Sequence, residues 1–237
     1  MTGAGRGIGL ALAAALAEAG AQVTLVARSG AGIEADAAAI RDAGFLAIAE
    51  RLDVADLNAV SRFCAARPAF HVLVNNAGTN RPKPMWQVEP EDYDAVMDLN
   101  VKAAFFVAQA CARRMHEDAV TGSLIHVGSQ MGHVGGPKRS LYCASKWALE
   151  GMSKAFSLDL AADGIRSNTI APTFIETEMT RPFFDDAAFR ESVLSKIKLG
   201  RLGRVEDLMG AVLFLASDAA ALVTGTSLVI DGGWTAE

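Results

Sequence analysis

The sequence lacks the features of secreted, membrane-spanning and metal-binding proteins. Its three cysteines, Cys64, Cys111 and Cys143, are an odd number without a CxxC spacing, which argues against a disulfide framework and a metal site. The N-terminus has no signal-peptide pattern. Apolar runs are interrupted by glycine, serine or charge before they reach the roughly 20 residues of a membrane span. We therefore expect a cytoplasmic protein with reduced thiols, no bound metal and no membrane partner.

A basic surface is also missing. The 237 residues carry a net charge of -5, so nothing indicates binding to nucleic acid or to an anionic membrane. The sequence contains no evident linker, repeat or low-complexity segment. Apolar residues make up 51% and charged residues 21% of the chain, an ordinary balance for a globular protein. We expect a single domain over residues 1–237.

Short β-rich runs alternate with helical segments along the whole chain. This alternation predicts right-handed βαβ crossovers and hence an α/β fold, a Rossmann-like doubly wound parallel sheet with helices on both faces. Strands are expected near 21–27, 45–49, 70–74, 123–127, 165–170 and 227–230. Helices are expected near 8–19, 33–43, 56–66, 91–115 (interrupted near Asn100), 141–162, 187–197 and 205–216.

One strand of such a sheet is not in the sequence. A glycine-rich turn of the kind seen at Thr2–Gly9 should follow a strand, but only Met1 and Thr2 precede the glycines. In a doubly wound sheet this strand is central, and its loss would expose two strand edges. Either the first strand is missing, or the sequence given begins after it; the sequence leaves both open.

The chain begins with glycines 3, 5, 7 and 9 in a TGxxxGxG pattern that leads into a helix. Small residues let the backbone approach a pyrophosphate, and the helix N-terminus supplies N–H groups for it. A tight structural turn is the alternative. The strand after this helix ends in Ala27-Arg28-Ser29, without the carboxylate that would bind a ribose 2′-hydroxyl. Arg28, with help from Arg6, therefore favours NADP(H) over NAD(H), unless Arg28 is simply solvated.

The stretch from Ser129 to Lys146 has the residues for proton transfer. Tyr142 and Lys146 are four residues apart, so on a helix they share a face. An unperturbed tyrosine has a pKa of about 10, and a nearby cation lowers that value. Upstream, the polar segment Asn75–Gly78 follows an apolar strand, where ligands bind in open α/β sheets.

Together these motifs resemble the short-chain dehydrogenase/reductase family, in its compact single-domain branch. The resemblance covers the chain from the turn at Thr2–Gly9 through Asp53-Val54, Asn75–Gly78 and Asn100 to the Ser129–Lys146 stretch. Ser129 lies 13 residues before Tyr142, as the family has it. Each motif alone is loose, but their order and spacing together are specific.

The resemblance implies a hydride transfer between a nicotinamide and a ketone or secondary alcohol. Tyr142 would be the general acid or base, Lys146 would lower its pKa and hold the nicotinamide ribose, Ser129 would hold the substrate oxygen, and Asn100 would bind a water that links Lys146 to solvent. The expected cofactor-binding residues are Gly3, Gly5, Arg6, Gly7, Ile8, Gly9, Arg28, Asp53, Val54, Asn76, Ala77, Gly78, Tyr142, Lys146, Pro172, Thr173, Ile175 and Thr177.

Some positions depart from the family pattern. After the strand that ends at Ile170, the usual Pro-Gly is replaced by Pro172-Thr173. Thr173 is more restricted than glycine, so we expect an altered wall of the nicotinamide pocket. Val205 stands where a helix-starting proline is common, a change of little functional meaning.

The substrate is expected to contact two polar residues, Gln130 and His133, and a cluster of phenylalanines on the segment 173–200. The irregular segment 173–200 contains Pro182 and is expected to be a lid, although a small satellite core under a loop is an equal alternative. The polar pair suits a sugar or polyol, and the aromatic set suits something more apolar, such as a 3-oxoacyl thioester. The candidate substrate residues are Gln130, His133, Phe174, Met179, Phe183 and Phe184.

A second function class is a dinucleotide-binding sensor or partner subunit without turnover. The intact set of Asn100, Ser129, Tyr142 and Lys146 argues against it. For the thioester alternative, an acidic carrier calls for a basic patch, and Lys138 and Arg139 give only thin support. The matching long helices in the family pair across a twofold axis, so the resemblance implies a homotetramer.

Overall fold

The computed structural model describes residues 1–178 and 180–236 and has a parallel α/β architecture. Strands β1 (Val23–Ala27) and β2 (Ala47–Arg51) pair in parallel. A second parallel sheet has the order β3 (Val72–Asn75), β4 (Gly122–Val127), β5 (Ile165–Pro172) and β6 (Ser227–Ile230). The expected strands are therefore confirmed to within a few residues, because short buried runs of β-branched residues mark them clearly.

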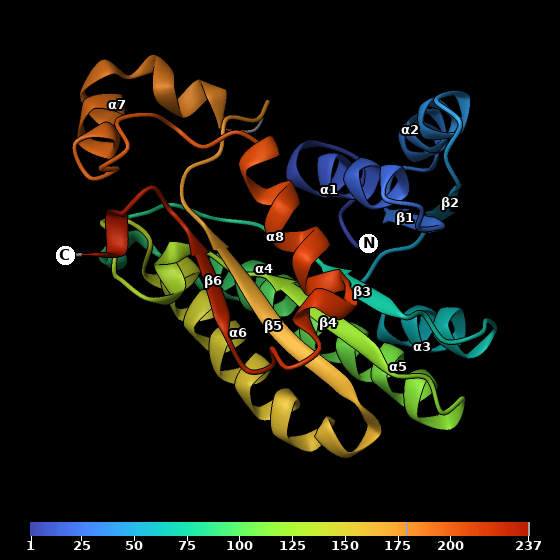
Figure 1. Cartoon of the computed structure of the whole chain (residues 1–237). Coiled ribbons are helices and arrows are strands. Elements are labelled where there is room, and N and C mark those ends of the chain that lie inside the picture. Colours follow the sequence, from blue (N-terminus) through green and yellow to red (C-terminus); the bar gives the residue numbers. More distant parts are fainter. Residues whose placement is uncertain (179, 237) are drawn as a thin grey trace.

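Helices cover both faces of the strands (Figure 1). Helices α1 (Gly7–Glu18) and α8 (Glu206–Ala216) pack together in one apolar core. Helices α3 (Leu57–Ala65) and α5 (Ala104–Glu117) form a second core on the opposite face, next to α6 (Ser140–Asp159). This arrangement confirms the α/β, doubly wound fold class.

The remaining helices lie at the periphery of the two cores. Helix α2 (Gly30–Asp42) packs on β1 and β2, and α7 (Ala187–Leu194) belongs to a separate apolar cluster near the C-terminus. Helix α4 (Pro90–Met97) leads through a π-helical segment, Asp98–Ala103, into α5. The interruption expected near Asn100 is thus confirmed, and it takes the form of a widened turn rather than a break.

The first residues lie between the two sets of strands. Met1 O accepts a hydrogen bond from Val26 N at 2.9 Å, and Thr2 N donates one to Val74 O at 3.0 Å. Ala4 N donates to Val26 O at 3.2 Å. Over the rest of their length β1 and β3 form no ladder with each other in the described part of the chain. The glycine turn is therefore anchored to the strands on both sides.

The helical run 90–117 is long and apolar enough to pass for a membrane span, with a mean hydropathy of 1.3. The sequence does not predict this, because glycine, serine or charged residues interrupt the apolar runs. Only 44% of the tested window is buried. Its inner face, with Val107, Cys111 and Met115, packs in the core with α3. A core helix passes the same test of length and composition, so this helix alone is weak evidence for a membrane.

Candidate active site

The glycine turn is packed too tightly for side chains. A Cβ on Gly9 would lie 2.3 Å from Gly3 O, and a Cβ on Gly3 would lie 2.9 Å from Ala77 Cα. Gly3 and Gly7 also have positive φ angles of 62° and 54°, which other residues rarely adopt. These glycines therefore keep the turn compact and its outer surface free of side chains.

The turn is tied to the segment that follows β3. Asn76 Nδ2 donates to Thr2 O at 3.0 Å and to Gly3 O at 3.1 Å. The Thr2 hydroxyl accepts from the main-chain N–H groups of Asn76 and Ala77, at 2.9 and 3.1 Å. The structure thus brings together the two glycine-containing segments that the sequence analysis assigned to the cofactor, with Gly78 beside Asn100.

The N-terminus of α1 suits an anion. Its N-cap residue, Arg6, makes no side-chain capping bond, and the first turn contains no acidic residue. The first N–H groups of a helix lack intrahelical partners and carry partial positive charge. A pyrophosphate next to Gly5, Gly7 and Ile8 would satisfy them, so this end of the turn fits a dinucleotide.

Two arginines lie where the adenine-side ribose of such a dinucleotide would be bound. Arg28 follows β1 and its side chain is exposed; Arg51 ends β2 and donates from Nε to Arg28 O at 3.3 Å. Arg51 was not singled out from the sequence, although its place at the end of the neighbouring strand was a signal for it. Asp53 is exposed nearby, whereas Val54 is 7% exposed and belongs to the core.

Ser129 follows β4 and begins a short 3-10 turn. Its hydroxyl donates to Gln130 Oε1 at 2.9 Å and accepts from Met131 N at 3.1 Å. Gln130 is only 2% exposed. It therefore orients the serine from inside the protein, and its contact with substrate stays a prediction.

Tyr142 lies in the first turn of α6, and burial raises the pKa of its phenol above the ordinary value. The Ser129 hydroxyl and the Arg139 charge lower it, but less strongly. Lys146 Nζ lies 5.6 Å from the centre of the Tyr142 ring and donates to Val127 O at 2.8 Å. Burial outweighs the opposing contributions of Ser129 and Arg139, so a lowering of the phenol pKa by Lys146 stays a prediction.

Lys146 is 6% exposed, and burial lowers its pKa to about 8, opposed by the charge of Glu150. On β4, the fully buried His126 has a pKa lowered to about 4, first by burial and then by the Lys146 charge. The ring nitrogens of His126 have no partner within the described part of the chain. His126 is therefore neutral near pH 7, and Lys146 is the buried cation of the site.

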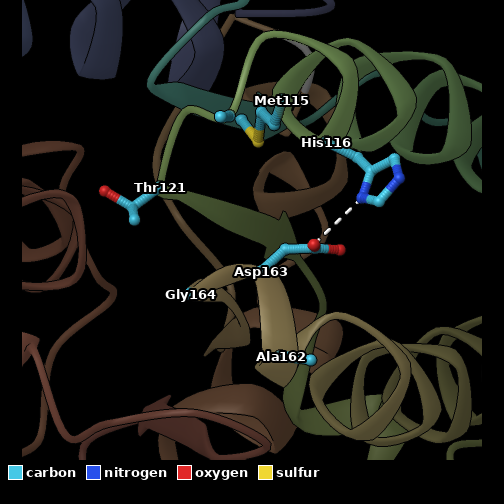
Figure 2. A pocket seen from close by; sticks show the side chains of 7 residues that line it. Met115, His116, Thr121, Ala162, Asp163 and Gly164 are labelled. Atoms are coloured by element: carbon cyan, nitrogen blue, oxygen red, sulfur yellow. Dashed lines mark hydrogen bonds and ion pairs between the residues drawn. The ribbon is translucent and has the colours of Figure 1, made fainter.

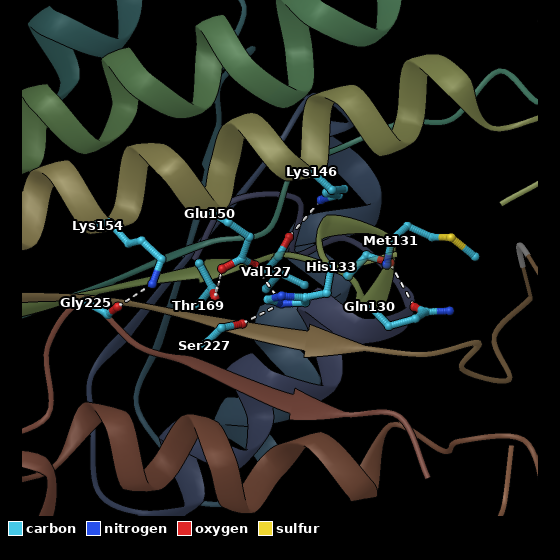
Figure 3. Close-up of polar contacts among 11 residues, drawn as sticks. Val127, Gln130, Met131, His133, Lys146, Glu150, Lys154, Thr169, Gly225 and Ser227 are labelled. Atoms are coloured by element: carbon cyan, nitrogen blue, oxygen red, sulfur yellow. Dashed lines mark hydrogen bonds and ion pairs between the residues drawn. The ribbon is translucent and has the colours of Figure 1, made fainter. Parts of the chain in front are cut away.

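A buried carboxylate lies one helical turn beyond Lys146 (Figure 3). Glu150 accepts from Thr169 Oγ1 at 2.7 Å, and its other oxygen lies 3.7 Å from His133 Nε2. That nitrogen is also 3.0 Å from Ser227 Oγ on β6. The ring of His133 thus contacts α6 and β6 while its side chain is 30% exposed, and its contact with substrate stays a prediction. The four-residue spacing from Lys146 was the sequence signal for Glu150.

Asn100 is 2% exposed and uses its side chain within the protein. Its amide nitrogen donates to Thr79 O at 2.8 Å and to Ser145 Oγ at 3.0 Å, and its oxygen accepts from Thr79 N at 2.8 Å. The side chain thus fastens the π-helical segment to α6 and to the segment after Gly78. Any water bound by Asn100 would have to use its main chain, which a π-helical turn makes available.

The segment after β5 completes the cofactor side. Thr173 Oγ1 is buried without a hydrogen-bond partner within the described residues, just beyond Pro172. Thr177 Cγ2 lies 3.5 Å from where a Gly7 Cβ would be. Ile175 is 3% exposed, and its carbonyl accepts from Thr180 Oγ1 at 2.6 Å. The unpartnered threonine hydroxyl and the bare glycine turn fit a nicotinamide dinucleotide between them.

The aromatic segment is mostly a small core of its own. Phe174 packs against Phe184, Phe189 and Trp234 with ring centres 5.8 to 5.9 Å apart, above Val193 and its neighbours. Phe183 is 44% exposed. The satellite core, one of the two alternatives for 173–200, is therefore present under this segment. Met179 lies outside the described residues.

An open depression of the surface lies elsewhere. It has a volume of about 490 Å³ and lies at the amino ends of β4 and β5, where His116 Nδ1 is 2.9 Å from Asp163 (Figure 2). The candidate site is at the opposite, carboxyl ends of the strands, which is where α/β sheets bind ligands. We therefore assign no part of the reaction to this depression.

The chain is similar to known proteins over nearly its whole length. A family model described as enoyl-(acyl carrier protein) reductase matches residues 3–235. The chain is 36% identical to D-erythrulose reductase of Gallus gallus over 99% of this chain and 94% of that protein. It is also 36% identical to a 3-oxoacyl-(acyl-carrier-protein) reductase of Escherichia coli (strain K12), over 98% and 95%.

Among solved structures, a gluconate 5-dehydrogenase from Burkholderia cenocepacia J2315, in complex with NADP and tartrate, is similar with a TM-score of 0.94. The two chains are 40% identical, and the similarity covers 100% of this chain and 94% of the other. The chain therefore belongs to the short-chain dehydrogenase/reductase family and is an NAD(P)-dependent oxidoreductase that acts on alcohols and ketones.

Proposed function

We propose that this enzyme interconverts a ketone and a secondary alcohol on a polyhydroxylated small molecule, with Tyr142 as the general acid or base. The observation that carries the proposal is the placement of Ser129 after β4 and of Tyr142 and Lys146 on α6, with Lys146 bonded to the carboxyl end of β4. NADP, when bound, accepts or supplies the hydride. The relatives named for D-erythrulose and gluconate support a sugar-like substrate.

The residues divide the work as follows. The single O–H of Ser129, which donates to Gln130 Oε1 in this structure, would turn to donate to the substrate oxygen and stabilise its developing charge. The phenol of Tyr142, whose pKa is raised, is protonated near pH 7 and can donate its proton to a carbonyl. In oxidation the same group takes the alcohol proton, which requires the nearby cations to stabilise the phenolate. Lys146 would hold the nicotinamide ribose, and the hydroxyl of Thr173 would face the nicotinamide.

The test is reduced-nicotinamide absorbance with a panel of ketones, polyols and sugar acids, for wild type and Tyr142→Phe. We expect the variant to lose about 10²- to 10⁴-fold in kcat, because proton transfer by a placed side chain contributes that much. Equal activity in both proteins would reject the mechanism. Turnover of a 3-oxoacyl thioester in preference to every polyol would instead favour the second candidate, a thioester reductase.

NADP(H) is proposed over NAD(H) because Arg28 and Arg51 flank the place of the ribose and no carboxylate follows β1. Arginine binds phosphate with paired N–H donors. We expect Arg28→Ala to raise KM for NADP⁺ and to leave KM for NAD⁺ nearly unchanged. A wild-type preference for NAD⁺ would contradict the assignment.

We also propose a homotetramer in the cytoplasm, without nucleic-acid or membrane partners. Large apolar side chains are exposed on the helices expected to pair: Phe106 on α5 is 37% exposed, and Trp147 and Leu158 on α6 are 54% and 80% exposed. Their burial between copies supports the proposal. A monomer in light scattering would contradict it.

A further inference from the structure

Arg139 differs from the other partly buried arginines in having no acceptor. Arg166 donates to the carbonyls of Leu215, Val223 and Ser217, and Arg67 and Arg114 pair with carboxylates. Within residues 1–178 and 180–236, no hydrogen bond or ion pair engages the Arg139 side chain. Its Cζ lies 5.0 Å from the centre of the Phe174 ring, and its side chain is half-buried.

The guanidinium of Arg139 is thus half-buried and unpaired within the described residues, with its N–H groups free for a ligand. Burial holds the pKa of Arg139 below its ordinary value. A contact with an aromatic face uses the positive charge but not the five N–H donors. A planar anion that accepts two of these donors would complement the side chain, because guanidinium and carboxylate match as a fork.

The guanidinium is also near the reacting group. Arg139 precedes α6, three residues before Tyr142, and its charge lowers the pKa of the phenol while the phenol in turn raises that of Arg139. Arg139 is the N-cap residue of α6 and Tyr142 is in its first turn, so the two side chains leave the same end of the helix. We therefore place an anion held by Arg139 on the substrate side of the phenol rather than on the dinucleotide.

The ring of Phe174 fixes where this anion sits. Phe174 is held by Phe184, Phe189 and Trp234 in the satellite core, so its face is a stable platform for the arginine. A guanidinium held in this way loses little freedom when its ligand arrives. The aromatic segment thus acts on the substrate through Arg139 rather than through its own rings.

We propose that Arg139 binds the carboxylate of the substrate and selects hydroxy acids and keto acids over neutral polyols. The proposal deepens the sugar-like assignment above and rests on it. Ser129 and Tyr142 hold the oxygen of the reacting carbon, and Arg139 holds a carboxylate farther along the same molecule. The complex of a 40% identical gluconate 5-dehydrogenase with tartrate, a dicarboxylate, agrees with this chemistry.

The experiment compares Arg139→Met, Arg139→Lys and the matched control Lys138→Gln, each with NADP⁺ present. Methionine keeps an apolar stem on Phe174, lysine keeps the charge without the fork, and Lys138 is an exposed neighbouring cation. Calorimetry with tartrate measures binding without turnover, and initial rates with D-gluconate and D-sorbitol separate KM from kcat. Melting temperatures show whether each variant is folded.

We expect Arg139→Met to weaken tartrate binding and raise KM for D-gluconate by about 10- to 100-fold, the loss typical of a charged hydrogen bond. KM for D-sorbitol stays near the wild-type value, Arg139→Lys falls in between, and Lys138→Gln resembles wild type. An equal change for gluconate and sorbitol, or unchanged tartrate binding, would overturn the proposal. Inorganic phosphate that competes more strongly than tartrate would also overturn it, in favour of a phosphate ester.

These results also separate the inference from the proposed function. If the enzyme turns over neutral polyols and Arg139→Met does not change tartrate binding, the proposed reaction stands and the proposed carboxylate site is rejected. If Arg139→Met loses tartrate binding but the wild type turns over no polyol or sugar acid, the carboxylate site stands and the proposed substrate class is rejected.

Discussion

The cofactor side and the substrate side of the site are built in different ways. On the proposed cofactor side, the turn at Gly3–Gly9 is fixed by hydrogen bonds from the Asn76 side chain to its main-chain carbonyls and by contacts that leave no room for a Cβ. On the substrate side, Phe174 and Arg139 are placed by a satellite core of side chains. The first type of construction tolerates almost no substitution, whereas the second can be repacked for another substrate without rebuilding the sheet.

The largest expected effect concerns the glycine turn on the cofactor side. Gly9→Val places atoms 2.3 Å from Gly3 O, a contact with main chain that cannot move aside. We expect a loss of more than about 3 kcal/mol in the free energy of unfolding, together with loss of NADP binding. The control is Gly210→Ala on α8, where a new Cβ meets nothing within 4 Å. Urea unfolding measures both, and a stable Gly9→Val protein would contradict the comparison.

Lys146 is placed for function at the expense of stability. Its folded pKa of about 8 lies below the unfolded value of 10.5, so the unfolded chain binds more protons between these values. The stability of the wild type should therefore rise from pH 8 to pH 10.5, with the full penalty, on the order of 3 kcal/mol, present below pH 8.

Lys146→Met removes this penalty and also the bond to Val127 O, so the variant should be at least as stable as wild type at pH 7. Its advantage should shrink as pH rises toward 10.5, while activity is lost at every pH. Urea unfolding at three pH values measures this, and a variant that is less stable at pH 7 by several kcal/mol would show that the lysine is structural.

His126 gives a smaller effect in acid. Its folded pKa of about 4 lies below the unfolded 6.5, so the wild type loses stability as pH falls from 6.5 through 4. His126→Leu removes a buried polar ring without partners in the described residues and should stabilise the protein by about 1 to 3 kcal/mol. The variant should also lose less stability than the wild type as pH falls from 6.5 to 4. Thermal unfolding from pH 4 to 7 measures it, with His71→Leu, a substitution at an exposed position, as control. An unchanged acid limb would mean that an ordered water satisfies the ring.

The smallest expected effect concerns the satellite core on the substrate side. Phe184→Leu shortens a ring that packs against Phe174, and we expect a loss of about 1 kcal/mol with a rise in KM for substrate but not for NADP⁺. Phe183→Leu changes an exposed ring and should leave both values unchanged. Equal effects of the two substitutions on KM would indicate that Phe183, rather than the satellite core, faces the substrate.

The same contrast explains how much the sequence could predict. The TGxxxGxG turn and the Tyr142–Lys146 pair are local patterns in which spacing alone determines geometry, and the strands follow from short runs of β-branched residues. The placement of the His133 ring depends on its contacts with Glu150 and Ser227, which lie on α6 and β6. Likewise, Arg51 joins Arg28 only through the pairing of β1 with β2. Contacts between distant segments are not encoded in any local pattern.

The hydrogen bonds of Asn76 have a mechanical consequence. They join the turn beside β1 to the segment after β3, and these two strands share no ladder of their own in the described part of the chain. A dinucleotide that lies across the turn and reaches Thr173 would bridge both sets of strands and bind only the folded protein. Its arrival should therefore slow amide hydrogen exchange in β1 and β2, far from the nicotinamide, and make the two sets of strands unfold as one unit.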